Sequence, residues 1–364
     1  MVEDKRDNSV NEQNKINTIS AKCENCGSNM VFSPTLQALQ CPHCESVRSF
    51  ESSKQVMELA IENAFSNGQV WNEGESVYRC QGCGASVVLS NGTSATICPY
   101  CETSHIVKSD ELAGLKPNAV FPFTLTAENS VENATLWAKK RFFAPKKFKK
   151  NLYSQNLRGV YEPCFTFDSS TFSTYRGRVG VKHTRTVGSG KNRRVETYIV
   201  WKNISGTFVR NFDDIIINST NSYSQKTLNT LMPYNTDTLV EYKHEFLTGY
   251  LARRYEIDLP TCWQNAKNVM DKTLRREILS QYHYDVVDFL NVDTSHSSVT
   301  YKYVLLPVYI LNFPYKKKLY PIYINGNTGK VTGKTPISPL KVLGAVLLGL
   351  VAVVGLGLLI YFNL

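Results

Sequence analysis

Residues 22–45 read KCENCGSNMVFSPTLQALQCPHCE, and residues 79–102 read RCQGCGASVVLSNGTSATICPYCE. Each stretch carries a Cys-x-x-Cys-Gly turn followed by a Cys-Pro-x-Cys-Glu turn. Every cysteine of the second copy lies 57 residues after its counterpart, and together the copies use eight of the ten cysteines. Four cysteines repeated at this spacing predict two small β domains of the zinc-ribbon type.

The predicted metal ligands are the cysteine thiolates. Zn²⁺ prefers four tetrahedral ligands, and its borderline-soft character suits sulfur. Because protein ligands fill all four positions, none stays open for a catalytic water, so both sites are expected to be structural. We expect two Zn²⁺ ions, one per ribbon, held by Cys23, Cys26, Cys41 and Cys44 in the first and by Cys80, Cys83, Cys98 and Cys101 in the second.

Three other kinds of chemistry use cysteines in this way. Disulfide frameworks occur mainly in extracellular chains, and a redox Cys-x-x-Cys motif normally occurs once, beside a βαβ pattern. Iron–sulfur clusters also accept four thiolates. His43 lies inside the second turn of the first copy and could replace one cysteine as a ligand. Zinc on all eight cysteines accounts best for both the spacing and the duplication.

The C-terminal residues 342–362, VLGAVLLGLVAVVGLGLLIYF, contain no charge. A helix rises 1.5 Å per residue, so a stretch of this length covers roughly 30 Å, the thickness of one bilayer core. Lys330, Lys334 and Lys341 precede it, and positive charge favours the cytoplasmic side. The sequence therefore predicts a single-pass protein of the cell membrane, with its N-terminal bulk in the cytoplasm and membrane lipid as one partner.

The expected architecture has several domains, in keeping with a length of 364 residues. Polar composition predicts a disordered N-terminus at residues 1–20. Two β zinc ribbons at 21–50 and 71–110 flank a helical linker at 51–70, in which a helix is expected over residues 53–65. A basic α+β domain is expected at 117–336, followed by the transmembrane helix at 342–362.

Within residues 117–336, apolar periodicity predicts helices at 130–144 and 260–282, the first capped by Ser130. The turn GSGKN at 188–192 predicts an antiparallel hairpin between long strands. Two apolar runs, YEPCFTF at 161–167 and LLPVYIL at 305–311, share a central proline, which suggests two related halves. Proline lacks a backbone N–H, so these runs are expected at sheet edges or strand starts.

The net charge of +10 favours anionic partners, either nucleic acid or phospholipid. Cations gather at residues 139–150 and on the predicted hairpin, whereas the ribbons are nearly neutral. The chain contains no phosphate-binding loop and no catalytic motif of the hydrolases or metalloproteases, so no enzymatic activity is expected. These features favour a membrane-anchored scaffold whose ribbons bind a cytoplasmic protein. The alternative is a membrane-attached nucleic-acid-binding protein that uses the ribbons and basic patches.

The paired cysteine turns, the run KKFK at 146–149, GVYEP at 159–163 and NGNTG at 325–329 together resemble bacterial TFIIB-type zinc-ribbon membrane proteins. Some of those proteins are similar to membrane components that recruit phage-shock protein A during envelope stress. The resemblance covers most of the chain and implies a cytoplasmic scaffold held at the membrane. It carries no catalytic residues, and only the eight cysteines transfer as site residues.

Overall fold

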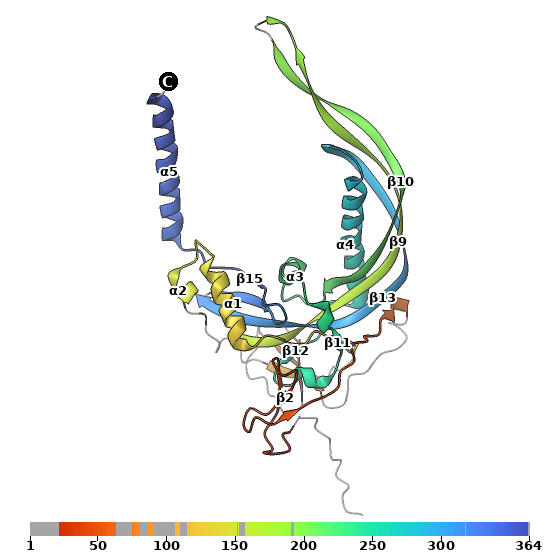
Figure 1. Cartoon of the computed structure of the whole chain (residues 1–364), viewed down its shortest axis with the longest axis vertical. Coiled ribbons are helices and arrows are strands. Elements are labelled where there is room, and N and C mark those ends of the chain that lie inside the picture. Colours follow the sequence, from red (N-terminus) through yellow and green to blue (C-terminus); the bar gives the residue numbers. More distant parts are fainter. Residues whose placement is uncertain are drawn as a thin grey trace, which may run out of the picture.

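A computed structural model describes residues 22–62, 75–80, 86–90, 106–109, 115–150, 152, 157–190, 193–316 and 318–362. In this part of the chain, a large curled sheet dominates, and its longest strands rise far above its base (Figure 1). The helix α4 lies inside the curl, the small ribbon sheet lies below the base, and α5 stands apart on the opposite side.

The structure contains two sheets and five α-helices among the described residues. The small sheet has the order β1-β2-β3, formed by β1 (Val31–Ser33), β2 (Ala38–Gln40) and β3 (Val47–Arg48). The helices are α1 (Ala127–Lys139), α2 (Lys146–Lys150), α3 (Gln225–Leu231), α4 (Leu259–Ser280) and α5 (Pro339–Phe362). The large sheet comprises β4 (Leu59–Ala60), β5 (Glu75–Cys80), β6 (Ser86–Ser90), β7 (Ile106–Ser109), β8 (Ala119–Val120), β9 (Leu157–Val187), β10 (Arg194–Asn218), β11 (Val240–Glu241), β12 (Leu251–Arg253), β13 (Val286–Tyr315), β14 (Lys318–Asn325) and β15 (Val331–Gly333).

The large sheet is built from two related halves that exchange their first strands. Each half runs from a short strand through a helix into a long strand and its hairpin partner. The first half is β8-α1-β9-β10 and the second is β12-α4-β13-β14. The strand β8 pairs in parallel with β13, β12 pairs in parallel with β9, and the two long strands pair antiparallel with each other. The relation between the two apolar runs is therefore visible in the topology.

The register of the two halves agrees residue by residue. In each half, the strand that follows the long strand ends on an asparagine. This asparagine pairs with the residue that comes directly after the proline of the long strand: Asn218 with Cys164, and Asn325 with Val308. Each asparagine Oδ1 accepts the backbone N–H of the residue two positions later. Each proline carbonyl also accepts an N–H from the residue that follows the asparagine.

The two prolines lie in the middle of β9 and β13, so the expectation that they mark strand starts or edges is wrong. Pro163 follows the pairing of Tyr161 with β12 and precedes the first pair with β10. Pro307 likewise lies between the pairing of Leu305 with β8 and the first pair with β14. Proline is tolerated at these positions because the neighbouring strand changes there, and no ladder hydrogen bond is lost.

The hairpin of the first half is far longer than that of the second. In the second half, β13 and β14 pair only from Val308 to Tyr315, whereas β9 and β10 pair from Cys164 to Val187. The additional part of β9 and β10, together with the first half of β13 and with α4, forms what we call the arm. Tyr175 and Ile204 of the arm are buried, and the Tyr175 hydroxyl is hydrogen-bonded to that of Tyr282, two residues after α4. The predicted antiparallel hairpin is confirmed, and its first strand runs without interruption from Leu157 to Val187.

The helix prediction in the second half is accurate, and that in the first half is displaced. The helix α4 occupies Leu259–Ser280, capped by Asp258, against the predicted 260–282. The helix α1 begins at Ala127, because the Thr126 side chain rather than Ser130 accepts the N–H of Asn129. No helix forms over residues 53–60 of the predicted linker. Those residues are extended, and Leu59 and Ala60 pair with β13 as β4.

The expected fold class is wrong in two respects. First, the domain predicted as α+β is mostly β-sheet, because its strand-like runs merge into strands of 25 to 31 residues. Second, among the described residues no helix is long and apolar enough to cross a bilayer. This finding overturns the transmembrane helix expected over residues 342–362, and with it the expectation of a single-pass protein in the cell membrane.

The packing of α4 can be tested at Met270, whose side chain is 0% exposed. Replacement by alanine leaves a cavity between the helix and the large sheet, so Met270→Ala should lower the free energy of unfolding by about 2–5 kcal/mol. The matched control Gln264→Ala lies on the exposed side of the same helix and should change it by less than about 0.5 kcal/mol. Chemical denaturation of both variants measures the difference, and equal midpoints would contradict this packing.

Candidate metal centre and its connection to the sheet

The four cysteines of the first ribbon converge on one point. Their sulfur atoms all lie within 4.8 Å of one another. The Sγ–Sγ distances are 3.4 Å from Cys23 to Cys44 and 3.4 Å from Cys26 to Cys41. Zinc–sulfur bonds of about 2.3 Å in a tetrahedron separate the sulfurs by roughly 3.8 Å, close to this arrangement. The group could therefore bind Zn²⁺. His43 is exposed and does not belong to it.

The two turns that supply the sulfurs have the same backbone geometry. In the first turn, the N–H of Cys23 donates to Ser28 and the N–H of Gly27 donates to Cys23. In the second turn, Cys41 and Glu45 occupy the equivalent donor positions. Gly27 and Glu45 both adopt positive φ, 72° and 60°. A glycine adopts this conformation at little cost in the first turn, whereas the second turn requires it from a glutamate.

The protein environment favours thiolates at three of the four positions. The backbone N–H of Cys26 lowers the pKa of the Cys23 thiol. Hydrogen bonds from Ser28 lower the pKa of Cys26, and those from Ser46 lower the pKa of Cys44. The Cys44 N–H lowers the pKa of Cys41, but desolvation and hydrogen bonds between the thiols outweigh it and raise the value to about 11. A divalent cation would stabilise all four thiolates together.

Aromatic packing joins the ribbon to the large sheet. Phe32 of β1 and Phe50 meet Phe246, which follows β11, with ring centroids 5.2 and 5.0 Å apart. The Phe32 N–H also donates to the carbonyl of Thr248 at 2.9 Å. The Gln37 side chain donates to the carbonyl of Phe123. A ribbon this small buries little apolar surface of its own, so these contacts fix its position.

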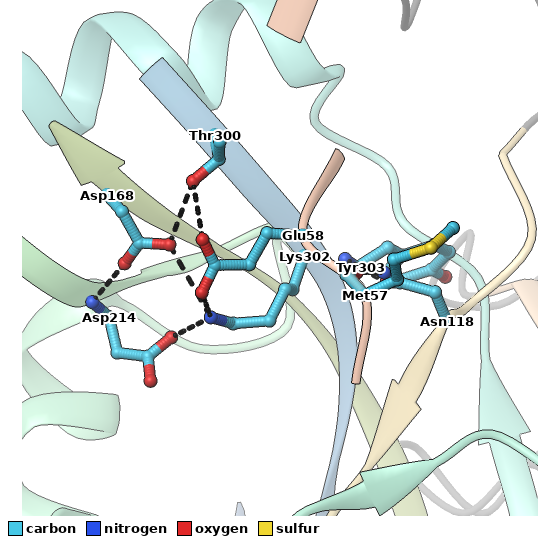
Figure 2. Close-up of polar contacts among 8 residues, drawn as sticks. All are labelled: Met57, Glu58, Asn118, Asp168, Asp214, Thr300, Lys302 and Tyr303. Carbon is cyan, nitrogen blue, oxygen red and sulfur yellow. Dashed lines mark hydrogen bonds and ion pairs between the residues drawn. The ribbon is translucent and has the colours of Figure 1, made fainter. Parts of the chain in front are cut away.

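The segment that leaves the ribbon is held by a buried lysine (Figure 2). Lys302 of β13 has a side chain only 5% exposed, and its ammonium group contacts three carboxylates. The Nζ–oxygen distances are 2.9 Å to Glu58, 3.5 Å to Asp168 and 2.8 Å to Asp214. Glu58 also accepts a hydrogen bond from Thr300. Glu58 belongs to the extended segment before β4, so this cluster ties the ribbon connection to the sheet.

The charges of the cluster shift one another's pKa values. Burial alone lowers the pKa of Lys302, but hydrogen bonds to Asp214 and Glu58 outweigh it and raise the pKa above its usual range. The hydrogen bond from Lys302 lowers the pKa of Glu58. Desolvation raises the pKa of Asp168. The Lys302 ammonium group therefore provides the positive charge for these carboxylates, and we infer that the cluster stabilises the fold.

The sequence analysis missed the lysine cluster. Its one signal was Lys302 within the run YKYVLLPVYIL at 301–311, where a single cation interrupts an apolar strand. A buried cation requires carboxylate partners. Those partners lie 46 or more residues apart along the chain, at Glu58, Asp168 and Asp214, so spacing gave no indication of them.

The second predicted metal site is only partly covered by the described residues. The strands β5, β6 and β7 from this part of the sequence form an antiparallel unit, and β6 pairs with β12 of the large sheet. Cys80 is the last residue of β5. Cys83, Cys98 and Cys101 lie outside the described residues. The expectation of zinc thus has one Cys₄ group to support it, and the second ion stays a prediction.

Comparison with known proteins gives one informative relative. The chain is similar to the uncharacterized protein YdjG of Bacillus subtilis (strain 168), with 28% identity over 326 residues. The match covers 89% of this chain and 92% of that protein. No protein-family model matches the chain, and no solved structure matches it. The resemblance to TFIIB-type zinc-ribbon proteins therefore stays a prediction.

The metal centre predicts a loss of zinc from a cysteine variant. Cys41→Ser removes a buried ligand, so zinc measured by elemental analysis of the purified full chain should fall by about one ion per molecule. Cys164→Ala is the matched control, because that buried cysteine lies in β9, away from the cluster, and the variant should keep the wild-type zinc content. Equal zinc in both variants would refute the assignment.

The lysine cluster predicts a second, independent loss of stability. Lys302→Met leaves three carboxylates without their cation, and should lower the free energy of unfolding by about 2–3 kcal/mol, less than for a fully buried pair because Glu58 and Asp214 are partly exposed. Lys226→Met, at an exposed position on α3, is the control and should have little effect.

The same stability difference should depend on pH. Because the pKa of Glu58 is lowered from 4.5, its pairing with Lys302 contributes fully above that pH. The contribution disappears as the pH falls through the lower folded-state value. The gap between the wild type and Lys302→Met should therefore shrink in acid. Urea denaturation at a series of pH values measures it, and a constant gap would show that Glu58 does not stabilise the fold through this pair.

Proposed function

We propose that the chain is a scaffold protein whose zinc ribbon presents a binding surface to another protein. The observation that carries this proposal is a closed Cys₄ group fastened to a large sheet. Four thiolates leave no ligand position for substrate, so the metal would stabilise the ribbon rather than react. The aromatic contacts at Phe32 hold the ribbon in place, and the Lys302 cluster holds the segment that follows it. A surface fixed in this way suits binding.

The exposed face of the ribbon favours a protein over a nucleic acid. Leu36 and Val47 are 49% and 52% exposed, on the turn after β1 and on β3. The neighbouring charges balance, because Lys22 and Arg48 are offset by Glu24 and Glu45. A surface that grips a phosphate backbone carries excess cations, which this one lacks. Apolar side chains among balanced charges are typical of protein interfaces.

A photocrosslinking amino acid placed at Val47 in living cells tests this function. We expect it to give a discrete protein adduct with the full chain. The same amino acid at Val209, which is 66% exposed on the arm, is the matched control and should not give that adduct. Mass spectrometry of the adducts identifies the partner.

Addition of Cys41→Ser should abolish the Val47 adduct, because the ribbon needs its metal to keep its shape. Western blotting would confirm that the variant accumulates to the wild-type level. Identical adducts from both positions, or an adduct that persists without Cys41, would overturn ribbon-mediated binding.

A further inference from the structure

The outermost part of the arm has no third strand among the described residues. The strand β13 begins at Val286, which pairs with Gly180, and α4 ends at Ser280. Beyond Gly180 only β9 and β10 continue, paired from Val181 with Val200 to Val187 with Arg194. We call residues 181–190 and 193–201 the tip ribbon. Figure 1 shows it projecting away from the rest of the sheet.

The tip ribbon is not needed to complete the fold. The equivalent hairpin of the second half stops at Tyr315, close to the core, and its half is complete without an extension. An isolated two-stranded ribbon is only marginally stable in water. A structure that extends so far past its support therefore indicates a surface that meets a partner.

The tip ribbon carries a marked positive charge. Four of its residues are exposed cations, against a single carboxylate, Glu196: the cations are Lys182, Arg185, Arg193 and Arg194. The side chains of Arg185 and Arg194 are 65% and 73% exposed, although both contact Glu196. The partner that complements this surface is an anion, and the spread of charge along both strands fits a polymer better than a small ion.

Aromatic rings hold one arginine of the tip ribbon, and a second arginine just below it, in position. The guanidinium of Arg185 lies over the ring of Tyr198, 5.6 Å from its centroid. At the base of the ribbon, Arg178 lies over Trp201 at 5.0 Å. Stacking of this kind restricts the side chains before a partner arrives, which lowers the entropy cost of binding.

The distribution of apolar side chains argues against a lipid surface. Directly paired residues share a face of the ribbon, so Val181 and Val200 lie on one face while Lys182 and Ile199 lie on the other. No continuous apolar face results. The described part of the turn, Gly188 to Gly190, offers no large apolar side chain to insert among acyl chains.

A nucleic-acid duplex meets these requirements. The major groove of B-form DNA is about 12 Å wide and admits a two-stranded β-ribbon, flanked by phosphates on both sides. We propose that the tip ribbon enters the major groove of double-stranded DNA, where Lys182, Arg185, Arg193 and Arg194 contact the backbone phosphates. The contact is governed by charge and shape, and it is separate from the protein-binding role of the zinc ribbon.

Fluorescence anisotropy with the full chain and a labelled 20-base-pair DNA duplex of mixed sequence tests the proposal. Each phosphate contact steepens the dependence of log Kobs on log salt by about 0.9. The variant Arg185→Gln/Arg193→Gln/Arg194→Gln should flatten that slope by about 2.7. Between 50 and 200 mM salt, the wild type should then lose about 40-fold more affinity than the variant. Removal of the lone carboxylate in Glu196→Gln should tighten binding.

A matched control tests whether DNA binding depends on the tip ribbon itself or only on the net positive charge of the chain. The variant Lys140→Gln/Lys146→Gln/Lys147→Gln removes three exposed cations from the region of α1 and α2, and should bind DNA as the wild type does. Zinc content and circular dichroism should be unchanged in both triple variants, because the substituted side chains are all exposed. An equal effect of both triple variants would mean non-specific attraction and would overturn the assignment.

Two further probes distinguish the partner class. Duplex RNA should compete poorly, because the major groove of an A-form helix is too deep and narrow for the ribbon. The tip ribbon should not cause the protein to co-sediment with vesicles that contain phosphatidylserine. Absence of DNA binding at 50 mM salt, or vesicle binding that the ribbon triple variant abolishes, would refute the proposal.

Discussion

The antiparallel pairing of β9 with β13 is the constraint on which the rest of the structure depends. Around its centre, where Glu162 faces Leu306, each long strand meets the first strand of the other half on its second edge. That exchange means neither half can form its sheet alone. It also sets the positions of the two prolines and of the two terminal asparagines. A slip of one residue would turn every side chain to the opposite face and expose the core.

The environment of β9 changes along its length, and the role of each part changes with it. Near the base, Val160, Tyr161 and Phe165 are fully buried, because helices and loops cover both faces of the sheet. In the middle, buried and exposed residues alternate, because only α4 covers the inner face. Beyond Gly180 the Asp285 carboxylate accepts the backbone N–H of Lys182, and most of the described side chains are exposed. One continuous strand therefore connects the buried core to a projecting surface.

Local signals in the sequence were reliable, and long-range ones were not. The structure brings together the four cysteines of the first copy, and it confirms α4 and the hairpin between β9 and β10, all of which were predicted from local sequence patterns. The apolar periodicity of residues 53–65 predicted a helix, but pairing with β13 overrides that preference, since Glu58 is drawn to Lys302. The apolar C-terminal run predicted a membrane span from composition alone, and the helix found there does not support one.

The zinc ribbon and the arm are stabilised by different interactions. Residues 22–50 bury too little apolar surface to fold stably without further interactions. A metal ion bound by the four converging thiolates can supply the missing stabilisation. The arm instead gains cohesion from length, because each added residue pair contributes backbone hydrogen bonds and buries side chains such as Tyr175. Cohesion at the zinc ribbon depends on metal supply, whereas that of the arm depends on the pairing of β9 with β10 and β13. The two candidate binding surfaces therefore lie on parts of the molecule that can be weakened separately, without one unfolding the other.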